Sequence, residues 1–311
     1  MKDEIFEAFN RKPVEIPIIA ITGGKGGTGK TTVAVNLTVA LNSKGKRIML
    51  VDTDVDSPTT GIVLGVESKP VEKVKIFTPK IVEEKCTKCG KCVEACRAHA
   101  LFQIAEKFPM FFEQLCSGCE ACILACPHEA IAIGEKTVGV IHQSSNNEVT
   151  LIGGELKPNE ARSAQVVTAT KNFSLKKTTN ENFDIMVIDT PPGTHCNVVQ
   201  SLRYADLAIA VTEPTPLGIY DLDLILQLAD RLKIPAQVII NKADIPGHDK
   251  EGVFEVTKQH RTEIIAEVPF DKKLFKSAEN GSPFITKYPE LKFSRAFMDV
   301  AESVLHQITK H

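Results

Sequence analysis

The sequence lacks three features that would connect it with membranes or nucleic acids. No apolar run reaches the roughly 18 residues that a membrane-spanning helix needs. The first residues, Met1-Lys2-Asp3-Glu4, contain no apolar signal segment. The net charge of −2 provides no basic surface for nucleic acid. We therefore expect a cytoplasmic chain with reduced thiols, no nucleic-acid partner and no membrane partner.

The chain does contain enough apolar sequence for a large core. Its 311 residues are 43% hydrophobic and 24% charged, which is typical of a soluble globular protein. A chain of this length is expected to form about two domains.

Eight of the nine cysteines form two runs of one pattern. The runs are Cys86-x-x-Cys89-x-x-Cys92-x-x-x-Cys96 and Cys116-x-x-Cys119-x-x-Cys122-x-x-x-Cys126. This spacing directs three thiolates of a run to one iron–sulfur cluster and the fourth to the cluster of the other run. The first [4Fe–4S] cluster is therefore expected on Cys86, Cys89, Cys92 and Cys126. The second [4Fe–4S] cluster is expected on Cys96, Cys116, Cys119 and Cys122.

Disulfides and zinc are the competing explanations for these cysteines. Disulfides fit poorly with a reducing compartment, and zinc sites use Cys-x-x-Cys pairs separated by a finger, not four cysteines per run. Residues 92–101 also parallel residues 122–131, and this pseudo-repeat resembles the bacterial two-cluster ferredoxins. The first run has Arg97 where the second has Pro127, a difference that could alter a turn without removing a ligand.

A second motif follows the apolar strand expected at residues 18–21, where a glycine-rich loop leads into a helix. Glycines let backbone N–H groups surround phosphate oxygens. Lys30 would reach the terminal phosphates, and the Thr31 hydroxyl would ligate Mg²⁺. The expected phosphate-binding loop comprises Gly24, Gly26, Gly27, Thr28, Gly29, Lys30, Thr31 and Thr32.

The same loop also satisfies the dinucleotide-binding pattern. Gly24, Gly26 and Gly29 have the required spacing, and Asp52 stands at the end of the next strand. A dinucleotide site, however, has no use for the lysine and threonine that follow these glycines, whereas a triphosphate site needs both a cation and a magnesium ligand. The loop therefore favours a nucleoside triphosphate.

Two later strands end in polar residues that suit such a site. Residues 183–188 form an apolar run that delivers Asp189 to the carboxyl edge of the sheet, where open α/β sheets bind ligands. We expect Asp189 to hold the Mg²⁺ shell. Residues 238–240 lead to Asn241 and Asp244, which are suited to hydrogen-bonding a base edge. The Asn-Lys-Ala-Asp sequence also matches the guanine-reading pattern of GTPases, so it leaves the identity of the base open.

The loop from Gly24 to Thr32, with its additional early lysine, resembles the deviant P-loop of the MinD/ParA/Mrp and nitrogenase iron-protein group. The likeness extends from about residue 16 to the C-terminus, through residues 52–57, 189–193 and 212–218. The chain resembles a MinD-superfamily ATPase with an inserted ferredoxin domain. This resemblance implies an enzyme that binds and hydrolyses ATP with Mg²⁺.

The resemblance also implies roles for individual residues. Lys25 corresponds to the signature lysine that reaches nucleotide phosphates, in relatives often across a dimer interface. Asp54 corresponds to the switch I aspartate that orients the attacking water, and residues 189–193 correspond to switch II. Asn241 and the loop at Pro269 would border the base. The expected catalytic residues are Lys25, Lys30 and Asp54. The expected Mg²⁺ site comprises Thr31, Asp54 and Asp189.

The order of the motifs predicts an α/β fold with a mostly parallel, doubly wound P-loop NTPase sheet and an inserted small α+β ferredoxin domain of the bacterial two-cluster type. The ATPase domain would comprise residues 1–70 and 136–311, and the ferredoxin domain residues 71–135. Beyond the first β-α-β unit, strands are expected at residues 137–141, 148–152, 184–188, 207–211, 237–240 and 264–268. The insertion follows switch I, although insertions also accumulate in loops at that end of a sheet.

Two functions remain open. In the first, ATP hydrolysis gates the flow of electrons through two clusters to a redox partner. In the second, the chain is a scaffold or carrier for iron–sulfur or metal-centre assembly, or positions a client protein, and the ferredoxin module senses redox state or docks the partner. A homodimer and a heterodimer with a related ATPase are both compatible with the resemblance.

Two further segments have simple interpretations. Cys196 lies just beyond switch II and is interpreted as an inert, buried cysteine. Bridging clusters in relatives draw two cysteines from each subunit, so a single cysteine outside the runs argues against such a cluster unless a partner adds ligands. Residues 297–308 have helical apolar spacing without a basic cluster, which predicts a core-packing helix and not a membrane-lying one.

Overall fold

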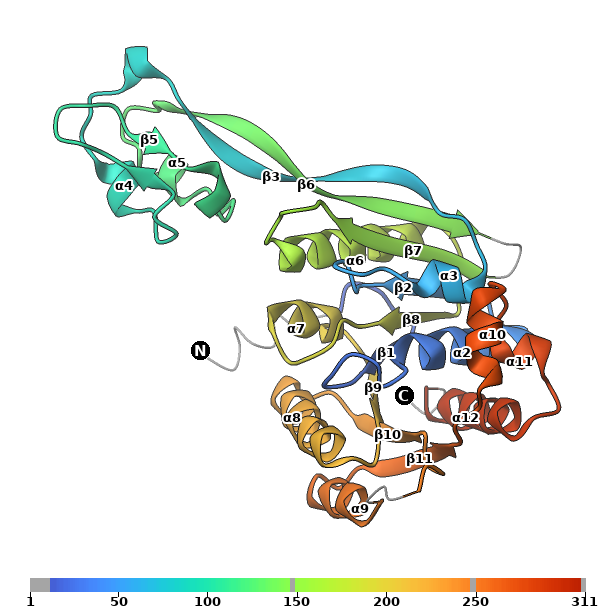
Figure 1. Ribbon diagram of the computed structural model, residues 1–311. Helices are drawn as coiled ribbons and strands as arrows, with labels where there is room; N and C mark the ends of the chain where they lie inside the picture. Colours follow the sequence, from blue (N-terminus) through green and yellow to red (C-terminus); the bar gives the residue numbers. More distant parts are fainter. Residues whose placement is uncertain (1–11, 146–148, 247–249, 309–311) are drawn as a thin grey trace.

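The computed structural model describes residues 12–145, 149–246 and 250–308. Within these residues a nine-stranded sheet has the strand order β11-β10-β9-β1-β8-β2-β7-β6-β3 (Figure 1). The strands from β11 to β7 are parallel, while β6 and β3 extend the sheet by antiparallel pairing. The prediction of a mostly parallel α/β sheet is confirmed. The strands are β1 (Ile18–Thr22), β2 (Ile48–Asp52), β3 (Lys69–Ile81), β6 (Ile131–Ser145), β7 (Val149–Leu156), β8 (Ile185–Asp189), β9 (Leu207–Thr212), β10 (Ala236–Asn241) and β11 (Glu263–Val268).

Helices cover both faces of the sheet (Figure 1). One face packs against α2 and α12, and the other against α6, α7, α8 and α9, so two separate apolar cores form. Short helices α3, α10 and α11 complete the first layer. The helices of these two layers are α2 (Lys30–Ser43), α3 (Thr60–Leu64), α6 (Ser163–Asn180), α7 (Cys196–Leu202), α8 (Pro216–Leu232), α9 (Lys250–Gln259), α10 (Lys273–Glu279), α11 (Phe284–Lys287) and α12 (Lys292–Ile308).

The central strands are short apolar runs because both of their faces are covered. Every residue of β1, β2 and β8 is buried, as expected for parallel strands between two helical layers. Both β2 and β8 end in an aspartate, and these two residues are paired neighbours in the sheet. The alternation of strand and helix thus brings acidic side chains to one edge of the sheet, next to the loop that follows β1.

Most strand positions agree with the sequence prediction. The runs predicted at residues 184–188, 207–211, 237–240 and 264–268 correspond to β8, β9, β10 and β11. The runs predicted at residues 137–141 and 148–152 correspond to parts of β6 and β7, and residue 148 lies outside the described residues. Residues 5–9, whose sequence is compatible with a short helix or with disorder, also lie outside them. Strand β3 was not predicted, because its prolines and lysines are typical of a surface loop.

Strands β3 and β6 form a long antiparallel ribbon. They pair from Lys69 and Gln143 at one end to Ile81 and Ile131 at the other. The ribbon begins in the ATPase sheet and extends beyond it, so that the chain between Ile81 and Ile131 lies at its far end (Figure 1). The residues with the predicted cluster ligands are therefore carried at a distance from the main sheet.

The segment at the end of the ribbon has its own small core. It contains a two-stranded sheet and short helices, and Phe77 and Ile131 of the ribbon pack there against Leu101 and Cys122. The elements are the 3₁₀ helices η1 (Glu83–Lys85) and η2 (Glu113–Leu115), the helices α4 (Lys91–Glu94) and α5 (Ala121–Ala125), and the strands β4 (Leu101–Phe102) and β5 (Met110–Phe111). This arrangement ties the cysteine-bearing loops to the end of the ribbon.

Helix α12 belongs to the core. Its residues Phe297, Val300, Ala301 and Val304 are at most 1% exposed and pack in the same core as α2. The prediction of a core-packing helix is confirmed for these residues. No helix in the described part of the chain is both long and apolar enough to cross a membrane.

The carboxylates of α8 hold the end of α9 through His260. Its Nε2 lies 2.7 Å from Asp223 and its Nδ1 lies 2.8 Å from Asp230. Burial lowers the pKa of His260, but the two carboxylates raise it by more, so the pKa lies above 6.5. The protonated ring therefore contributes stability that is complete below pH 6.5 and is lost as the pH rises through the raised pKa.

Replacing His260 with glutamine is expected to destabilise the protein more at low pH. The free energy of unfolding should fall by about 1 kcal/mol at pH 6 and by much less at pH 9, where the wild-type ring is neutral. Urea unfolding of both proteins at the two pH values measures this difference. An equal loss at pH 6 and pH 9 would show that packing, and not the charge, accounts for the effect.

Candidate functional site

The loop between β1 and α2 surrounds a buried ammonium group. Lys30, the first residue of α2, is only 6% exposed, and its Nζ donates a hydrogen bond of 2.9 Å to the Lys25 carbonyl. Burial lowers the pKa of Lys30, while Asp189 and Asp54 favour its charged form. A cation thus stands at the N-terminus of α2, where the backbone N–H groups and the helix dipole also favour phosphate.

Asn241 supports this loop from the end of β10. Its Nδ2 donates to the Thr28 carbonyl at 2.7 Å, and its Oδ1 accepts from the backbone N–H of Lys242. Gly29 makes this contact possible, because it has a φ of +95° and a Cβ there would lie 2.3 Å from Asn241 Nδ2. Asn241 was expected to border the base, and in the structure it also contacts the phosphate-binding loop.

The other residues assigned to the base lie beside Asn241. Asp244 accepts at Oδ1 from the backbone N–H of Phe270 at 2.6 Å, and the backbone N–H of Ala243 donates to the Val268 carbonyl at 3.0 Å. These contacts join the loop after β10 to the loop after β11, which contains Pro269. The structure therefore brings together Asn241, Asp244 and Pro269 at the carboxyl ends of adjacent strands.

Asp189 ends β8 as a buried carboxylate with one oxygen available. It is 1% exposed, and its Oδ2 accepts a 3.0 Å hydrogen bond from Thr60 Oγ1. The Thr31 side chain is also hydrogen-bonded to it, but Oδ1 is buried without a partner. Burial raises the pKa of Asp189 to about 6. An unpartnered buried oxygen is costly unless it has a ligand, and an oxygen pair from Thr31 and Asp189 suits Mg²⁺.

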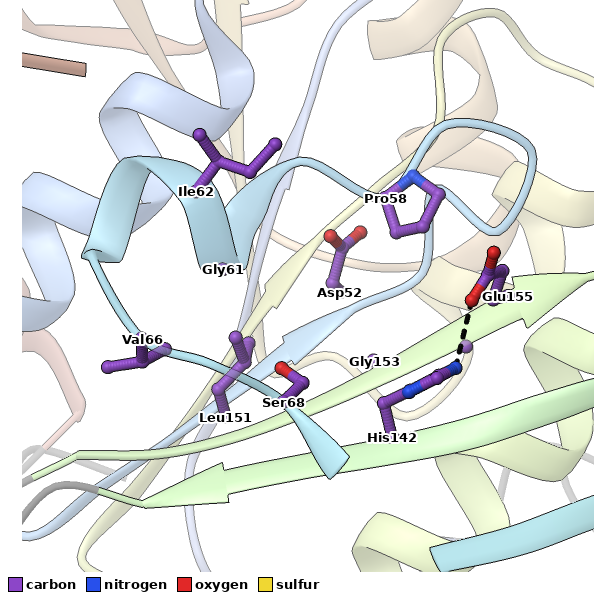
Figure 2. A pocket seen from close by; sticks show the side chains of 11 residues that line it. Asp52, Pro58, Gly61, Ile62, Val66, Ser68, His142, Leu151, Gly153 and Glu155 are labelled. Atoms are coloured by element: carbon purple, nitrogen blue, oxygen red, sulfur yellow. Dashed lines mark ion pairs between the residues drawn. The ribbon is translucent and has the colours of Figure 1, made fainter. Parts of the chain in front are cut away.

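Asp52 organises the loop that precedes α3. It is 2% exposed and accepts the backbone N–H groups of Asp54 at 3.0 Å and Thr60 at 3.1 Å. Burial and the neighbouring Asp189 raise its pKa to about 7. A cavity of about 240 Å³ lies beside it, between α3 and the strands β6 and β7 (Figure 2). By accepting these two backbone hydrogen bonds, Asp52 fixes the loop that carries the half-buried Asp54.

Asp54 lies near the cation of the loop. Lys30 interacts favourably with its carboxylate, although burial raises the pKa of Asp54 overall. The structure therefore gathers Lys30, Asp54, Thr31 and Asp189 at one edge of the sheet. Each of these four residues was expected to contact phosphate, the attacking water or Mg²⁺.

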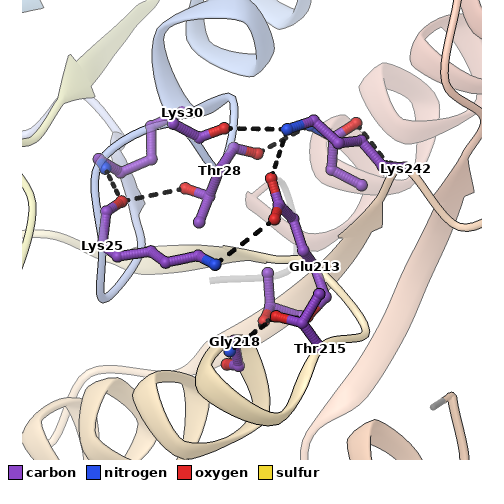
Figure 3. Close-up of polar contacts among 10 residues, drawn as sticks. Lys25, Thr28, Lys30, Glu213, Thr215, Gly218 and Lys242 are labelled. Atoms are coloured by element: carbon purple, nitrogen blue, oxygen red, sulfur yellow. Dashed lines mark hydrogen bonds and ion pairs between the residues drawn. The ribbon is translucent and has the colours of Figure 1, made fainter. Parts of the chain in front are cut away.

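Lys25 is held by a carboxylate that the sequence analysis did not single out. Its Nζ lies 3.5 Å from Glu213 Oε2, and Lys242 Nζ lies 2.5 Å from the other oxygen of Glu213 (Figure 3). Lys242 also donates to the Gly27 carbonyl. Glu213 follows β9, so it links the phosphate-binding loop to the loops after β9 and β10. Glu213 would therefore compete with a nucleotide phosphate for Lys25.

Replacing Glu213 with glutamine is expected to release Lys25. Because the lysine no longer has to give up an ion pair, the Kd for nucleotide should fall about twofold to fivefold, the range of a partly exposed pair. Nucleotide titration of the variant against the wild type measures this change, with Glu251→Gln on α9 as an exposed control. Weaker binding by the Glu213 variant would instead show that Glu213 supports the bound state.

The eight cysteines of the two runs line two separate pockets at the end of the ribbon. The first pocket is lined by Cys86, Cys89, Cys92 and Cys126, together with Ile81, Pro109, His128 and other residues. The second is lined by Cys96, Cys116, Cys119 and Cys122, together with Phe77, Leu101 and Phe111 among others. Each pocket takes three cysteines from one run and one from the other. These are the two groups of four that the spacing predicts.

Backbone N–H groups face the fourth cysteine of each run. The N–H of Ala100 donates to Cys96 Sγ at 3.2 Å, and the N–H of Ala130 donates to Cys126 Sγ at 3.3 Å. Such bonds favour a thiolate and orient it. Within residues 12–145, 149–246 and 250–308, no three His, Cys, Asp or Glu side chains form a group that could hold a single metal ion.

Comparison with known proteins places the chain in a family. Residues 19–284 match the family described as CobQ/CobB/MinD/ParA nucleotide binding domain. The chain belongs to this family. The resemblance to the MinD/ParA group is therefore confirmed, and with it the assignment of this family member as an ATPase. The dinucleotide interpretation of the loop is set aside on this evidence.

The alignments of individual relatives with this MinD/ParA-family chain cover most of its length. An uncharacterized protein of Methanocaldococcus jannaschii is 34% identical over 279 residues, which cover 89% of this chain and 94% of that protein. The iron-sulfur cluster carrier protein of Pyrococcus abyssi is 25% identical and covers 93% of this chain and 86% of its own length. The structure of the septum site-determining protein MinD with Mg-ADP from Pyrococcus horikoshii has a TM-score of 0.61 at 20% identity, over 93% of this chain and 96% of that one. The last comparison shows a shared fold.

Three residues of the MinD/ParA-family chain acquire importance only from the structure. Thr60 bonds both aspartates at the edge of the sheet, Glu213 holds Lys25, and Arg162 contacts the cysteine-bearing segment. The contacts of Thr60 with Asp189, of Glu213 with Lys25 and of Arg162 with Cys116 join residues far apart in sequence, whereas Asp52 lies eight residues before Thr60. Glu213 lies within the motif at residues 212–218, but nothing in that motif indicates a lysine as its partner.

Proposed function

We propose that this ATPase binds two [4Fe–4S] clusters and delivers electrons to a partner protein under the control of ATP. The observation that carries the proposal is the pair of four-cysteine pockets at the end of a ribbon whose other end belongs to the ATPase sheet. Each cluster, when bound, would take up and release one electron at a time. Residues 71–135 would form the ferredoxin domain, and residues 1–70 and 136–311 the ATPase domain.

The proposed hydrolysis uses the residues at the edge of the sheet. Lys30 and the N-terminus of α2 neutralise phosphate charge, and Lys25 adds a second cation after leaving Glu213. Thr31 and Asp189 would hold Mg²⁺, while Asp54, near Lys30, would orient the attacking water. The reaction needs alignment and charge neutralisation more than covalent help, and these residues would contribute both.

The proposed nucleotide is ATP. The family resemblance favours ATP, although the Asn241–Asp244 segment also matches a guanine-reading pattern. One N–H of the Asn241 amide already donates to the Thr28 carbonyl. A base could therefore contact only the other N–H or the amide oxygen. A competition titration tests this choice, and tighter binding of GTP than of ATP would contradict it.

The proposed active form is a dimer, either of two copies or with a related ATPase. The expectation that Cys196 is buried is wrong, because Cys196 is exposed at the start of α7, just beyond switch II. Two copies would supply two such thiols, which is too few for a four-ligand bridging cluster. After anaerobic reconstitution we therefore expect about eight irons per chain, all on the two runs. A clear excess over eight would indicate an additional cluster at the interface.

An anaerobic redox titration tests the electron-carrier function. The signals of the reduced clusters are followed by electron paramagnetic resonance without nucleotide, with MgADP and with a non-hydrolysable MgATP analogue. A shift of about 60 mV for a one-electron couple, equivalent to about 1.4 kcal/mol, would show that the two sites are coupled. Coincident titrations would exclude this thermodynamic coupling.

A role in iron–sulfur assembly is the second candidate function. Its support is the similarity to proteins named iron-sulfur cluster carrier protein in three Pyrococcus species and in Methanocaldococcus jannaschii. In that case the ferredoxin segment would sense redox state or dock a partner. Replacing the cysteines of both runs with alanine distinguishes the two, because only an electron carrier must then lose all activity with its partner.

A further inference from the structure

Arg162 joins the ATPase sheet to the loop that leads into the second cysteine run. It is 7% exposed, its Nε donates to the Cys116 carbonyl at 2.8 Å, and its Nη2 donates to the carbonyls of Glu113 at 2.8 Å and Gln114 at 3.1 Å. One planar guanidinium thus holds three backbone carbonyls of the single turn at residues 113–116. Glu160 pairs with Arg162 and, at 3.0 Å, with Lys136 of β6. The loop is therefore fixed to the start of α6 by a charged network.

Helix α6 starts at this contact and runs back across the face of the sheet, beside α7. Arg162 is the residue before its first turn, and the buried face of the helix packs on β7 and α7. Lys171 stands nine residues further, about 14 Å along the helix axis. Figure 1 shows α6 between the ribbon and α7. A continuous helix can move as one body, so a displacement at one end is transmitted to the other.

Lys171 fastens α6 to the end of α7. Its side chain is 3% exposed, and its Nζ donates to the carbonyls of Gln200 at 2.9 Å, Ser201 at 2.8 Å and Arg203. Burial lowers the pKa of Lys171 to about 7, whereas three carbonyls at a helix C-terminus favour its ammonium form. These are carbonyls that α7 leaves without internal partners. The lysine is thus the point at which α6 and α7 are bonded.

The end of α7 in turn touches the backbone of Asp189. Ser201 Oγ donates to Thr53 Oγ1 at 2.8 Å, and Thr53 donates to the Asp189 carbonyl from its hydroxyl at 2.7 Å and from its N–H at 2.9 Å. Thr53 lies between Asp52 and Asp54, so both switch segments meet here. A hydrogen-bonded path therefore runs from Cys116 through Arg162, α6, Lys171 and Ser201 to Asp189.

We propose that α6 is a mechanical link in which Arg162 and Lys171 are positioning residues that couple the loop of Cys116 to the switch segments around Asp189. The proposal rests on the nucleotide binding proposed above, and it predicts an asymmetry. Nucleotide state alters the loop at residues 113–119, and hence the environment of the pocket formed by Cys96, Cys116, Cys119 and Cys122. The pocket formed by Cys86, Cys89, Cys92 and Cys126 responds less.

Hydrogen–deuterium exchange on the full, anaerobically reconstituted chain tests the link. Exchange is compared without nucleotide, with MgADP and with a non-hydrolysable MgATP analogue in the wild type and in Lys171→Met. In the wild type we expect nucleotide to change exchange at residues 113–119 about fivefold or more. In Lys171→Met that response is lost, while the P-loop amides at residues 24–31 remain protected by nucleotide. Lys176→Met, on the exposed side of α6, is the matched control and should behave as the wild type.

Arg162→Gln cuts the link at its other end and keeps the proposal testable if Lys171→Met folds poorly. It should also abolish the response at residues 113–119 and leave P-loop protection intact, with the exposed Lys157→Gln as its control. A loop that responds to nucleotide equally in the wild type and in both variants overturns the link. P-loop protection without any response in the wild-type loop also overturns it, and leaves the proposed function standing. Absence of P-loop protection contradicts both.

Discussion

Replacement of Lys30 with methionine is expected to reduce the rate of ATP hydrolysis by about 10²-fold to 10³-fold. Lys30 is the buried cation of the phosphate-binding loop, and loss of one preorganised charge at a reacting group has an effect of this size. Methionine keeps the length and apolar volume of the stem. Phosphate release by the purified protein measures the effect, with Lys176→Met as an exposed control of the same chemistry.

The stability of the same variant separates catalysis from folding. Burial lowers the pKa of Lys30, which means that the charged ammonium reduces the stability of the folded protein. The unfolding temperature without nucleotide should therefore stay unchanged or rise in Lys30→Met, and the stabilisation by added nucleotide should be lost. A marked fall in the unfolding temperature would make Lys30 a structural residue and would remove the basis for its assigned role.

Paired cysteine substitutions are expected to have equally large effects and to reveal which thiols share a cluster. The double variant Cys92→Ala/Cys126→Ala removes two cysteines of one pocket, so it should retain about four of eight irons per chain. The double variant Cys92→Ala/Cys96→Ala removes one cysteine from each pocket and should retain almost none. Iron and sulfide analysis after anaerobic reconstitution measures both.

The opposite result would show that each run binds its own cluster. In that case Cys92→Ala/Cys96→Ala would keep about four irons and Cys92→Ala/Cys126→Ala would lose nearly all of them. Both variants lack two cysteines, so a general loss of stability affects them alike. Cys196→Ala serves as the control and should retain about eight irons, because Cys196 lies outside both pockets.

The parts of the site that could be predicted from the sequence are those in which chemistry depends on local spacing. The loop at Lys30, the strand ending at Asp189 and the four-residue groupings of the cysteines all follow from short-range patterns. The structure brings these residues together as expected, since parallel strands end at one edge of the sheet. The cluster, catalytic and magnesium roles of these residues stay predictions until the experiments above are done.

The parts that could not be predicted depend on contacts between distant residues. Arg162 and Cys116 are 46 positions apart, and Glu213 follows Lys25 by far more, so neither pair leaves a local pattern. Residues 71–81 of strand β3 were assigned to the inserted domain. The strand pairs with β6 along its whole length, so the predicted boundaries at residues 71 and 135 fall within one continuous ribbon.

The position of β3 at the end of the sheet also explains its unusual composition. An outermost strand offers free backbone groups to any other extended chain, and proteins discourage such pairing with prolines and lysines. β3 contains Pro70 and Pro79, and its lysines are Lys69, Lys73, Lys75 and Lys80. These residues discourage another chain from pairing with the outer edge of β3, while its other edge pairs with β6. The ribbon that carries the cysteines is therefore protected from aggregation through the exposed edge of β3.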